Sequence, residues 1–122
     1  MQVKQVKIGI RTVDDALDAF VSMGEAIEHG EEVKAQPAGV YFTNLNAFRK
    51  ALTQKRLELL HAIREGKPTS LHHLARIVHR DIKNVSVDVK YLSQIGLVEL
   101  QEKDNRLFPI VDYERIELDI AV

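Results

Sequence analysis

Three consecutive helix signals between Thr53 and Gly96 constrain the fold of this chain more than any other feature of its sequence. Thr53 and Ser70 stand where a side-chain oxygen can cap the first turn of a helix, and apolar residues recur behind both at helical spacing. A longer helix begins at Ile82 and ends at Gly96, a residue type that readily adopts the positive φ of a helix C-terminus. The positions expected to face the core are Leu57, Leu60, Ile63, Leu71, Leu74, Ala75, Val78, Ile82, Val85, Val89, Leu92 and Ile95. The sequence therefore predicts three short helices packed around one apolar core.

Two short strands are predicted directly after the third helix. They cover 97–100 and 106–110 and flank a polar tip with Asp104 and Asn105 at its turn. Three helices, the second one short, followed by a hairpin are the layout of a winged helix-turn-helix, whose third helix can enter a DNA major groove about 12 Å wide. We therefore predict an α+β fold in which residues 47–122 form a winged helix-turn-helix domain with a C-terminal strand.

Residues 1–46 are predicted to form a strand-helix-strand extension of this domain. A strand is expected over Val3–Arg11, an amphipathic helix over 13–28 and a short strand at Val40–Phe42. These segments contain no pattern typical of catalytic residues, so we expect the extension to serve as a dimerisation or partner surface.

Two further elements complete the predicted order. Asn44 can cap a short helix that runs through Leu52, and the last strand, 116–120, alternates apolar and acidic residues. We expect the strand Val3–Arg11, the helix 13–28 and the last strand to form the surface for a second copy or another protein. The alternative is that these segments complete the core of one subunit.

The net charge of the chain is −1, but its charged residues are unevenly distributed along the sequence. Residues 47–106 carry 12 basic and seven acidic side chains, a net charge of +5, whereas residues 1–46 and 107–122 each carry a net charge of −3. A basic middle between acidic ends is typical of a protein that presents one face to a polyanion. The alternative is that the basic residues only form a solvated face.

The exposed side of the third helix carries side chains suited to DNA. Asn and Gln can pair with adenine edges, Lys can bind guanine or phosphate, and Tyr can bind phosphate. Arg80 precedes the helix N-terminus, where backbone N–H groups and the helix dipole favour a phosphate, and Lys103 and Arg106 bracket the hairpin tip. The predicted DNA-binding residues are Arg80, Lys83, Asn84, Ser86, Val87, Lys90, Tyr91, Gln94, Lys103 and Arg106.

Asp88 is the exception on this helix, because its carboxylate would repel phosphate. In the predicted packing, several basic residues of the helix that follows Thr53 lie close enough to Asp88 to form an ion pair with it. We therefore expect Asp88 to pair with Lys55, Arg56 or Arg64 and to fix the third helix in place.

Four motifs between Val40 and Ile120 are shared with a known family. They are T-x-K-R-L-E-L-L from Thr53, L-A-R in the second helix, R-D-x-K-N-V-x-x-D-V-K-x-L in the third, and G-L-V-E at the first hairpin strand. On these motifs the chain resembles small predicted transcriptional regulators with a MarR-like winged helix. The resemblance implies a DNA-binding regulator of a nearby operon, and some members accompany toxin-like genes. The sequence departs from the pattern at Ser86 and Val87, where a pair such as His-Arg is expected. The alternatives are that Val87 contacts a thymine methyl group or that this chain binds DNA weakly.

Other function classes have no support in the sequence. The chain has no cysteine, which excludes disulfide scaffolds, thiolate metal sites and cysteine nucleophiles. Its five histidines form no H-x-x-x-H pair, and no nucleophile or cofactor motif occurs, so we expect no enzyme, no catalytic residues, no metal and no cofactor. No apolar run approaches the roughly 20 residues of a membrane helix. The first residues lack the apolar core of a signal peptide. We therefore expect a cytoplasmic protein with no membrane partner.

Two functions follow from these patterns. The first is a sequence-specific regulator of transcription that represses its own or a neighbouring operon. Its expected partners are double-stranded DNA and a second copy of the chain. The second is an antitoxin-like or complex-assembly module that uses the same fold to bind a protein, such as a toxin, without DNA. The two differ in salt dependence, because each neutralised phosphate adds about 0.9 to the slope of log affinity against log salt.

Overall fold

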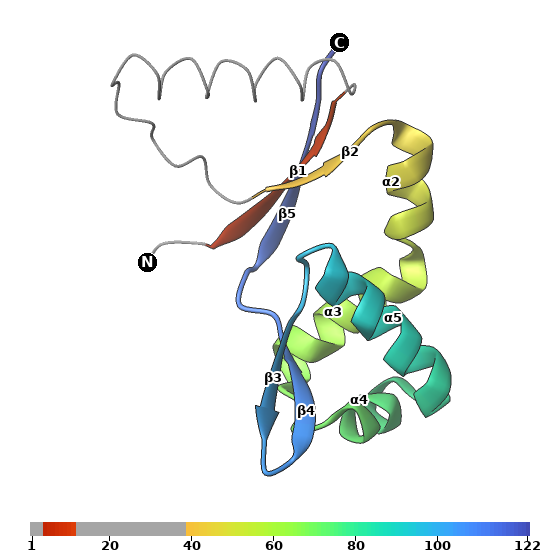
Figure 1. Cartoon of the computed structure of the whole chain (residues 1–122), viewed down its shortest axis with the longest axis vertical. Coiled ribbons are helices and arrows are strands. Elements are labelled where there is room, and N and C mark those ends of the chain that lie inside the picture. The colour runs from red at the N-terminus through yellow and green to blue at the C-terminus, as the bar shows by residue number, and fades with distance from the viewer. Residues whose placement is uncertain (1–3, 12–38) are drawn as a thin grey trace.

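The computed structural model describes residues 4–11 and 39–122. Within these ranges five strands form two separate sheets and four helices occur, so this part of the chain is a mixed α+β structure, as predicted. The elements are β1 (Gln5–Ile10), β2 (Val40–Phe42), α2 (Leu45–Ala51), α3 (Gln54–Gly66), α4 (Leu71–Val78), α5 (Ile82–Gln94), β3 (Glu99–Lys103), β4 (Arg106–Ile110) and β5 (Arg115–Ile120). The sheet of β1, β2 and β5 lies at one end, and α3, α4, α5 and the β3–β4 hairpin lie at the other (Figure 1). The predicted helix 13–28 lies outside the described residues.

The three-stranded sheet joins segments from opposite ends of the sequence. Its order is β2-β1-β5, and both neighbours of β1 run parallel to it. The register places Gln5 opposite Arg115 and Ile10 opposite Ile120. The C-terminal strand, which the predicted domain boundary groups with residues 47–122, is therefore hydrogen-bonded to a strand of the segment before residue 46.

The predicted helix caps at Asn44, Thr53 and Ser70 are confirmed. The Asn44 side chain accepts a hydrogen bond from the backbone N–H of Ala47 at 2.8 Å, and the Thr53 and Ser70 hydroxyls accept equivalent bonds at 3.3 and 3.0 Å. Asp81 caps α5 in the same way at 3.1 Å. Each bond satisfies a backbone N–H that the helix itself leaves without a partner, so the start of each helix is set locally.

The ends of α3, α4 and α5 share one feature, a residue with positive φ. Lys67 has a φ of 43°, His79 a φ of 55° and Gly96 a φ of 88°. The first two of these residues lie in the segments Gly66-Lys67-Pro68 and His79-Arg80-Asp81, at which α3 and α4 end. A residue in the left-handed conformation ends a helix and turns the chain within two or three residues. Because the turns are this short, the three helices can pack on one another.

The β3–β4 hairpin turns on Asp104 and Asn105, as predicted. Their φ values of 54° and 61° are both positive, the combination found in a type I′ turn between antiparallel strands. The first strand starts two residues later than predicted. Leu97 and Val98 do not belong to it, because their N–H groups donate to the Leu92 carbonyl at 2.9 and 3.3 Å and their side chains are buried.

One apolar core joins the helices to the three-stranded sheet. Its buried members are Ile8, Leu59, Leu60, Ile63, Leu74, Ala75, Val85, Val89, Leu92, Leu97, Val98, Val111 and Tyr113. The prediction that Leu57 faces this core is wrong, since it is 40% exposed and Leu59 is buried instead. Arg56 occupies the inward position in the first turn of α3, where its guanidinium pairs with a carboxylate of α5.

Tyr113 belongs to the connection from β4 to β5, and its side chain packs into the core. It is buried, and its hydroxyl donates a hydrogen bond of 2.7 Å to the Leu97 carbonyl. Burial raises the pKa of Tyr113 well above its ordinary value, and the neighbouring carboxylate of Asp112 raises that pKa further. The hydroxyl therefore stays protonated and holds the start of the hairpin against the connection to β5.

Candidate nucleic-acid interface

The outer stripe of α5 consists of four residues, Lys83, Val87, Lys90 and Gln94. These residues follow the i, i+4, i+7 and i+11 spacing of one helix face, and all four are exposed. Val87 lies in the middle of the stripe with 64% of its surface exposed. Asn84 is exposed beside the stripe. The stripe turns away from the core because Val85, Val89 and Leu92 on the opposite face are completely buried.

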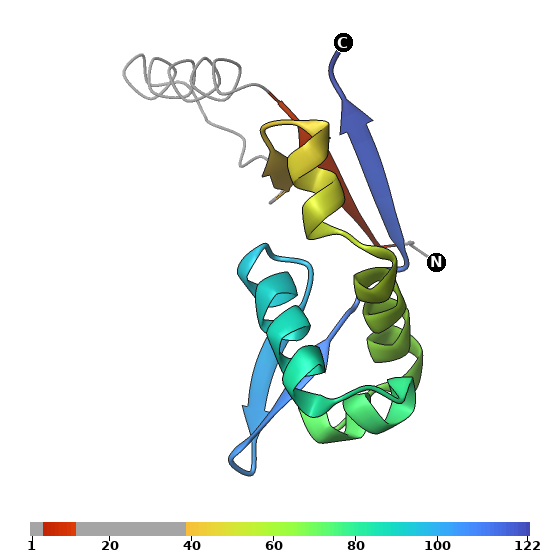
Figure 2. The ribbon, with the colours of Figure 1, turned by 90° about the vertical axis from the view of Figure 1, so that its right-hand side faces the viewer.

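The hairpin tip lies at the same end of the molecule as α4 and the start of α5 (Figure 2). A hollow of about 630 Å³ separates the tip from these helices. It is lined by Ser70, Leu71, His72, Arg76, Ile82, Ser86, Asn105, Arg106 and Leu107. The tertiary structure thus brings Ser86 of α5 and Arg106 of the hairpin, two predicted contact residues, to one concave surface.

Lys103 and Arg106 are direct neighbours across the hairpin. They are paired in the β3–β4 register, and both are exposed. Asp104 at the turn is exposed beside them. The tip therefore carries two positive charges and one negative charge, and it can approach an anion only through the two basic side chains.

Arg80 lies in a different environment from the exposed lysines of α5. Its Nη2 donates to Asp88 Oδ2 at 2.8 Å, and its side chain is only 21% exposed. Arg56 Nε donates to the other Asp88 oxygen at 3.2 Å, so the pairing of Asp88 with Arg56, one of three predicted partners, is confirmed. Two guanidinium groups surround one carboxylate, which leaves this cluster with one net positive charge.

Tyr91, also a predicted contact, belongs to the same cluster. The Arg56 guanidinium lies over the Tyr91 ring at 4.2 Å from its centroid and donates from Nη1 to the Ala51 carbonyl at 2.7 Å. The ring is half-buried. Arg56 thus joins Asp88 and Tyr91 of α5 to α3 and to the end of α2, and Arg80 joins the turn before α5 to the same carboxylate.

Two residues of this surface were not among the predicted contacts. His72 and Arg76 are exposed on α4, and together with His79 and Arg80 they line a second hollow of about 610 Å³ between α4 and the start of α5. The i, i+4 spacing of His72 and Arg76 was the available signal, because it places both on one side of a helix whose other side carries Leu74.

Metal-binding clusters and membrane-spanning helices are both absent from the described part of the chain. Residues 4–11 and 39–122 contain no group of three or more histidine, aspartate or glutamate side chains placed to hold a metal ion. The helices within the same ranges are all too short or too polar to span a bilayer.

The fold and site define a small mixed α+β protein in which a helix and a hairpin tip present basic side chains at one end. Residues 51–118 match the model of the HVO_A0114 family, and the chain belongs to this family. The match contains α3, α4, α5 and the hairpin, and therefore the whole candidate surface. No curated protein matches the chain.

Proposed function

We propose that this protein is a sequence-specific double-stranded DNA-binding regulator of transcription that represses its own or a neighbouring operon. In this proposal α3, α4, α5 and the β3–β4 hairpin are a winged helix-turn-helix, with α5 as the recognition helix and the hairpin as the wing. The observation that carries the proposal is the exposed outer stripe of α5 on a helix whose Ser86 shares one hollow with Arg106 of the hairpin tip. The resemblance to MarR-like regulators supports the same function.

The side chains of the α5 stripe match the chemistry of base edges. Lys83 and Lys90 can bind guanine or phosphate, Asn84 and Gln94 can pair with adenine, and Val87 can contact a thymine methyl group. An exposed valine between two lysines has no role in the core of the protein, because its outward direction keeps it in water. Contact with a thymine methyl group would remove this apolar surface from water.

The hairpin and α4 supply contacts to the phosphate backbone in this proposal. Lys103 and Arg106 would bind phosphates on one side of the groove, and Arg76 on α4 would bind them on the other. Phosphate contacts position a protein on the duplex without reading its sequence. Arg80 has a different task, since its pairing with Asp88 orients α5.

We also propose that two copies bind DNA as a cytoplasmic homodimer. The sheet of β1, β2 and β5 lies at the end opposite the hairpin tip, and Leu118 and Ile120 of β5 are 44% and 47% exposed. A two-fold dimer through this sheet would leave both copies of α5 free to meet half-sites about 34 Å apart.

The second candidate function is an antitoxin-like or complex-assembly module that binds a protein. The exposed Val87 of α5 and Leu107 of the hairpin, which is 41% exposed, favour it because exposed apolar side chains suit a protein partner. The proposed regulator and this module differ in what the α5 stripe binds.

Fluorescence anisotropy with duplex DNA from upstream of the gene tests the proposal. The protein should bind this duplex more tightly than a scrambled one, with a steep loss of affinity as salt rises. The Lys83→Ala/Lys90→Ala variant should lose affinity and lower the salt slope by about 0.9 for each phosphate contact removed. The matched control is Arg49→Ala/Lys50→Ala, which removes two exposed charges from α2. Equal weak binding to both duplexes, or equal losses in both variants, would contradict the proposal.

A further inference from the structure

Strand β5 has one edge without a partner strand. In the order β2-β1-β5 its inner edge is paired with β1 along all six residues, and no strand of the described ranges, 4–11 and 39–122, pairs with its outer edge. The backbone N–H and C=O groups along an outer edge are free to bind another strand. The outer edge of β5 is therefore a template for one more strand.

The apolar row of β5 continues the apolar face of the sheet to this edge. Ile116, Leu118 and Ile120 share one face by strand alternation, and the last two are exposed. Edge strands usually avoid association by means of proline, lysine or a bulge. The β5 strand contains no proline and no lysine, and its register with β1 is unbroken. Apolar side chains at an edge without these protections favour pairing with a second strand.

The charged row of β5 is complementary to itself when the strand is reversed. Arg115, Glu117 and Asp119 share the other face, with the positive charge at one end and the negative charges in the middle and at the other end. If a second copy runs antiparallel with Glu117 at the two-fold axis, Arg115 of each copy lies opposite Asp119 of the other. Oppositely charged residues that face each other across two strands stabilise the pair.

The same register also suits the remaining positions. Ile116 of each copy lies opposite Leu118 of the other, so apolar side chains meet on one face. Glu117 lies opposite its own copy, and Lys7 of β1 is its direct neighbour in the sheet. The Lys7 ammonium group already pairs with Asp119 at 3.5 Å. One lysine from each copy therefore flanks the two central carboxylates and offsets their repulsion.

Neighbouring registers are less favourable. An axis at Leu118 would place Glu117 opposite Asp119 twice, which sets like charges against each other. An axis at Ile116 would place Leu118 opposite Glu114, which sets an apolar side chain against a carboxylate. The charge pattern of β5 thus selects the axis at Glu117.

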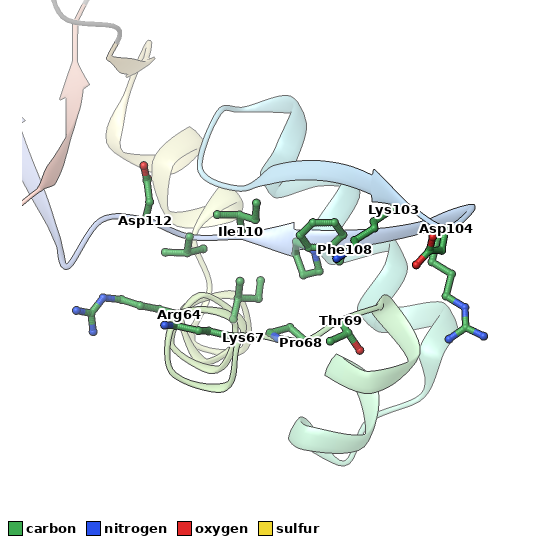
Figure 3. A pocket seen from close by; sticks show the side chains of 13 residues that line it. Arg64, Lys67, Pro68, Thr69, Lys103, Asp104, Phe108, Ile110 and Asp112 are labelled. Carbon is green, nitrogen blue, oxygen red and sulfur yellow. The ribbon is translucent and has the colours of Figure 1, made fainter.

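The start of β5 is attached to the rest of the molecule. The Glu114 N–H donates to the Lys4 carbonyl at 2.9 Å, and the Glu114 carboxylate pairs with Arg64 of α3 at 3.3 Å. Asp112 pairs with Lys4 at 3.3 Å and lies beside a cavity of about 890 Å³ between α3 and β4 (Figure 3). An edge that is already ordered loses less conformational entropy when a second strand binds.

We propose that two copies of the chain join their sheets edge to edge, with β5 antiparallel to β5 of the second copy and Glu117 at the two-fold axis. The product is one continuous six-stranded sheet. This inference specifies the edge, the direction and the register of the homodimer, and it rests on the proposed function for the existence of that dimer. Pairing of the edges needs no DNA, so the experiments are done without it.

Charge exchange at the two ends of the interface tests the pairing by sedimentation equilibrium. Arg115→Asp sets acidic side chains against each other, and Asp119→Arg sets basic ones against each other. We expect each variant alone to dimerise about tenfold more weakly than the unmodified protein. An equal mixture of the two should dimerise like the unmodified protein, because opposite charges then meet at both ends. Arg49→Asp, a charge reversal on α2, is the control and should have no effect.

A single introduced thiol tests the register, because the chain has no cysteine of its own. Glu117→Cys places two thiols opposite each other at the axis, and mild oxidation should link the two copies. In Arg115→Cys the two thiols would lie about 13 Å apart along the strands, since four residues of about 3.4 Å separate them. Disulfides do not form between Cα atoms more than about 7 Å apart. Arg115→Cys should therefore stay unlinked on a non-reducing gel.

The outcomes separate the edge pairing from the proposed function. Restored dimerisation in the mixture would show that both variants fold, and its absence would overturn the pairing. A dimer that neither charge variant weakens, or equal linkage of the two cysteine variants, would overturn the pairing and leave the homodimer itself in place. A monomer at all concentrations would overturn both, and DNA binding by one copy would still be measured by the anisotropy experiment.

Discussion

Arg80 and Asp88 are joined by a hydrogen bond of 2.8 Å between the turn that precedes α5 and the middle of that helix. Arg56 of α3 binds the second oxygen of the same carboxylate at 3.2 Å. The three side chains are only 17–21% exposed, so their charges are largely shielded from water. This cluster holds α5 in a fixed orientation, and the exposed stripe of the helix depends on it.

Asp88→Asn tests the stabilising role of the cluster. The change leaves two partly buried guanidinium groups without their carboxylate, and we expect the free energy of unfolding to fall by about 2 kcal/mol. Chemical denaturation measures this difference. Asp112→Asn, whose pair with Lys4 is exposed on both sides, is the control and should change stability by less than about 0.5 kcal/mol. Equal effects of the two substitutions would contradict the role assigned to Asp88.

Arg106→Gln and Asn84→Ala/Gln94→Ala separate the two kinds of DNA contact. Loss of a phosphate contact at Arg106 should weaken binding of the operator duplex and of a scrambled duplex to the same extent. Loss of base contacts at Asn84 and Gln94 should weaken operator binding by about 1–3 kcal/mol and leave the scrambled duplex unaffected. Anisotropy titrations with both duplexes provide the comparison, and the assignment of roles is wrong if the two variants behave alike.

Tyr113→Phe removes the hydrogen bond to Leu97 and should cost about 1 kcal/mol of stability near neutral pH. The raised pKa of Tyr113 also predicts a dependence on alkaline pH. Its hydroxyl ionises in the unfolded chain above a pH of about 10 but stays protonated in the folded protein, so the stability it contributes is present below that pH and is lost above it. Denaturation at increasing pH should show a smaller alkaline decline in Tyr113→Phe. An identical decline in both proteins would refute this role.

Gly96→Ala should destabilise the protein by about 1–2 kcal/mol, because the φ of 88° at Gly96 is strained for a residue with a side chain. There is room for the added methyl group, since its nearest neighbour, Val40 Cγ2, lies at 3.8 Å, so the cost would come from the backbone. Gly66→Ala is a useful comparison, because Gly66 belongs to α3 and alanine favours a helix, although the added Cβ would lie 3.1 Å from Ile77 Cδ1 and this side-chain end must shift. Thermal unfolding would show the first variant to be the less stable of the two; the reverse order would disprove the explanation.

The proposed dimer predicts a mass that depends on protein concentration. Sedimentation equilibrium should show twice the mass of the chain at high concentration, and Leu118→Lys should shift the equilibrium toward the monomer. Lys50→Ala, on α2, should leave the equilibrium unchanged. A monomer mass that does not change with dilution would exclude the dimer.

Local features of the fold could be predicted from the sequence because they depend on neighbouring residues. Asn44, Thr53 and Ser70 cap helices through side chains that reach only three residues along the chain, and Asp104 and Asn105 form a turn from their own backbone preferences. The start of the hairpin could not be predicted in this way. The N–H groups of the residues after Gly96 can donate either to a carbonyl at the end of α5 or to a neighbouring strand. The packing of the core favours the first arrangement.

The sequence by itself determined the class of structure, the order of the helices and the outward stripe of α5, since each follows from capping, apolar spacing and turn residues. Only the tertiary structure decided that β5 pairs with β1 and that Arg80 binds Asp88. It also decided that the hairpin encloses a cavity against α3. These features join residues far apart in the chain. Their partners are selected by how the elements pack and by which charges must be neutralised once they are removed from water.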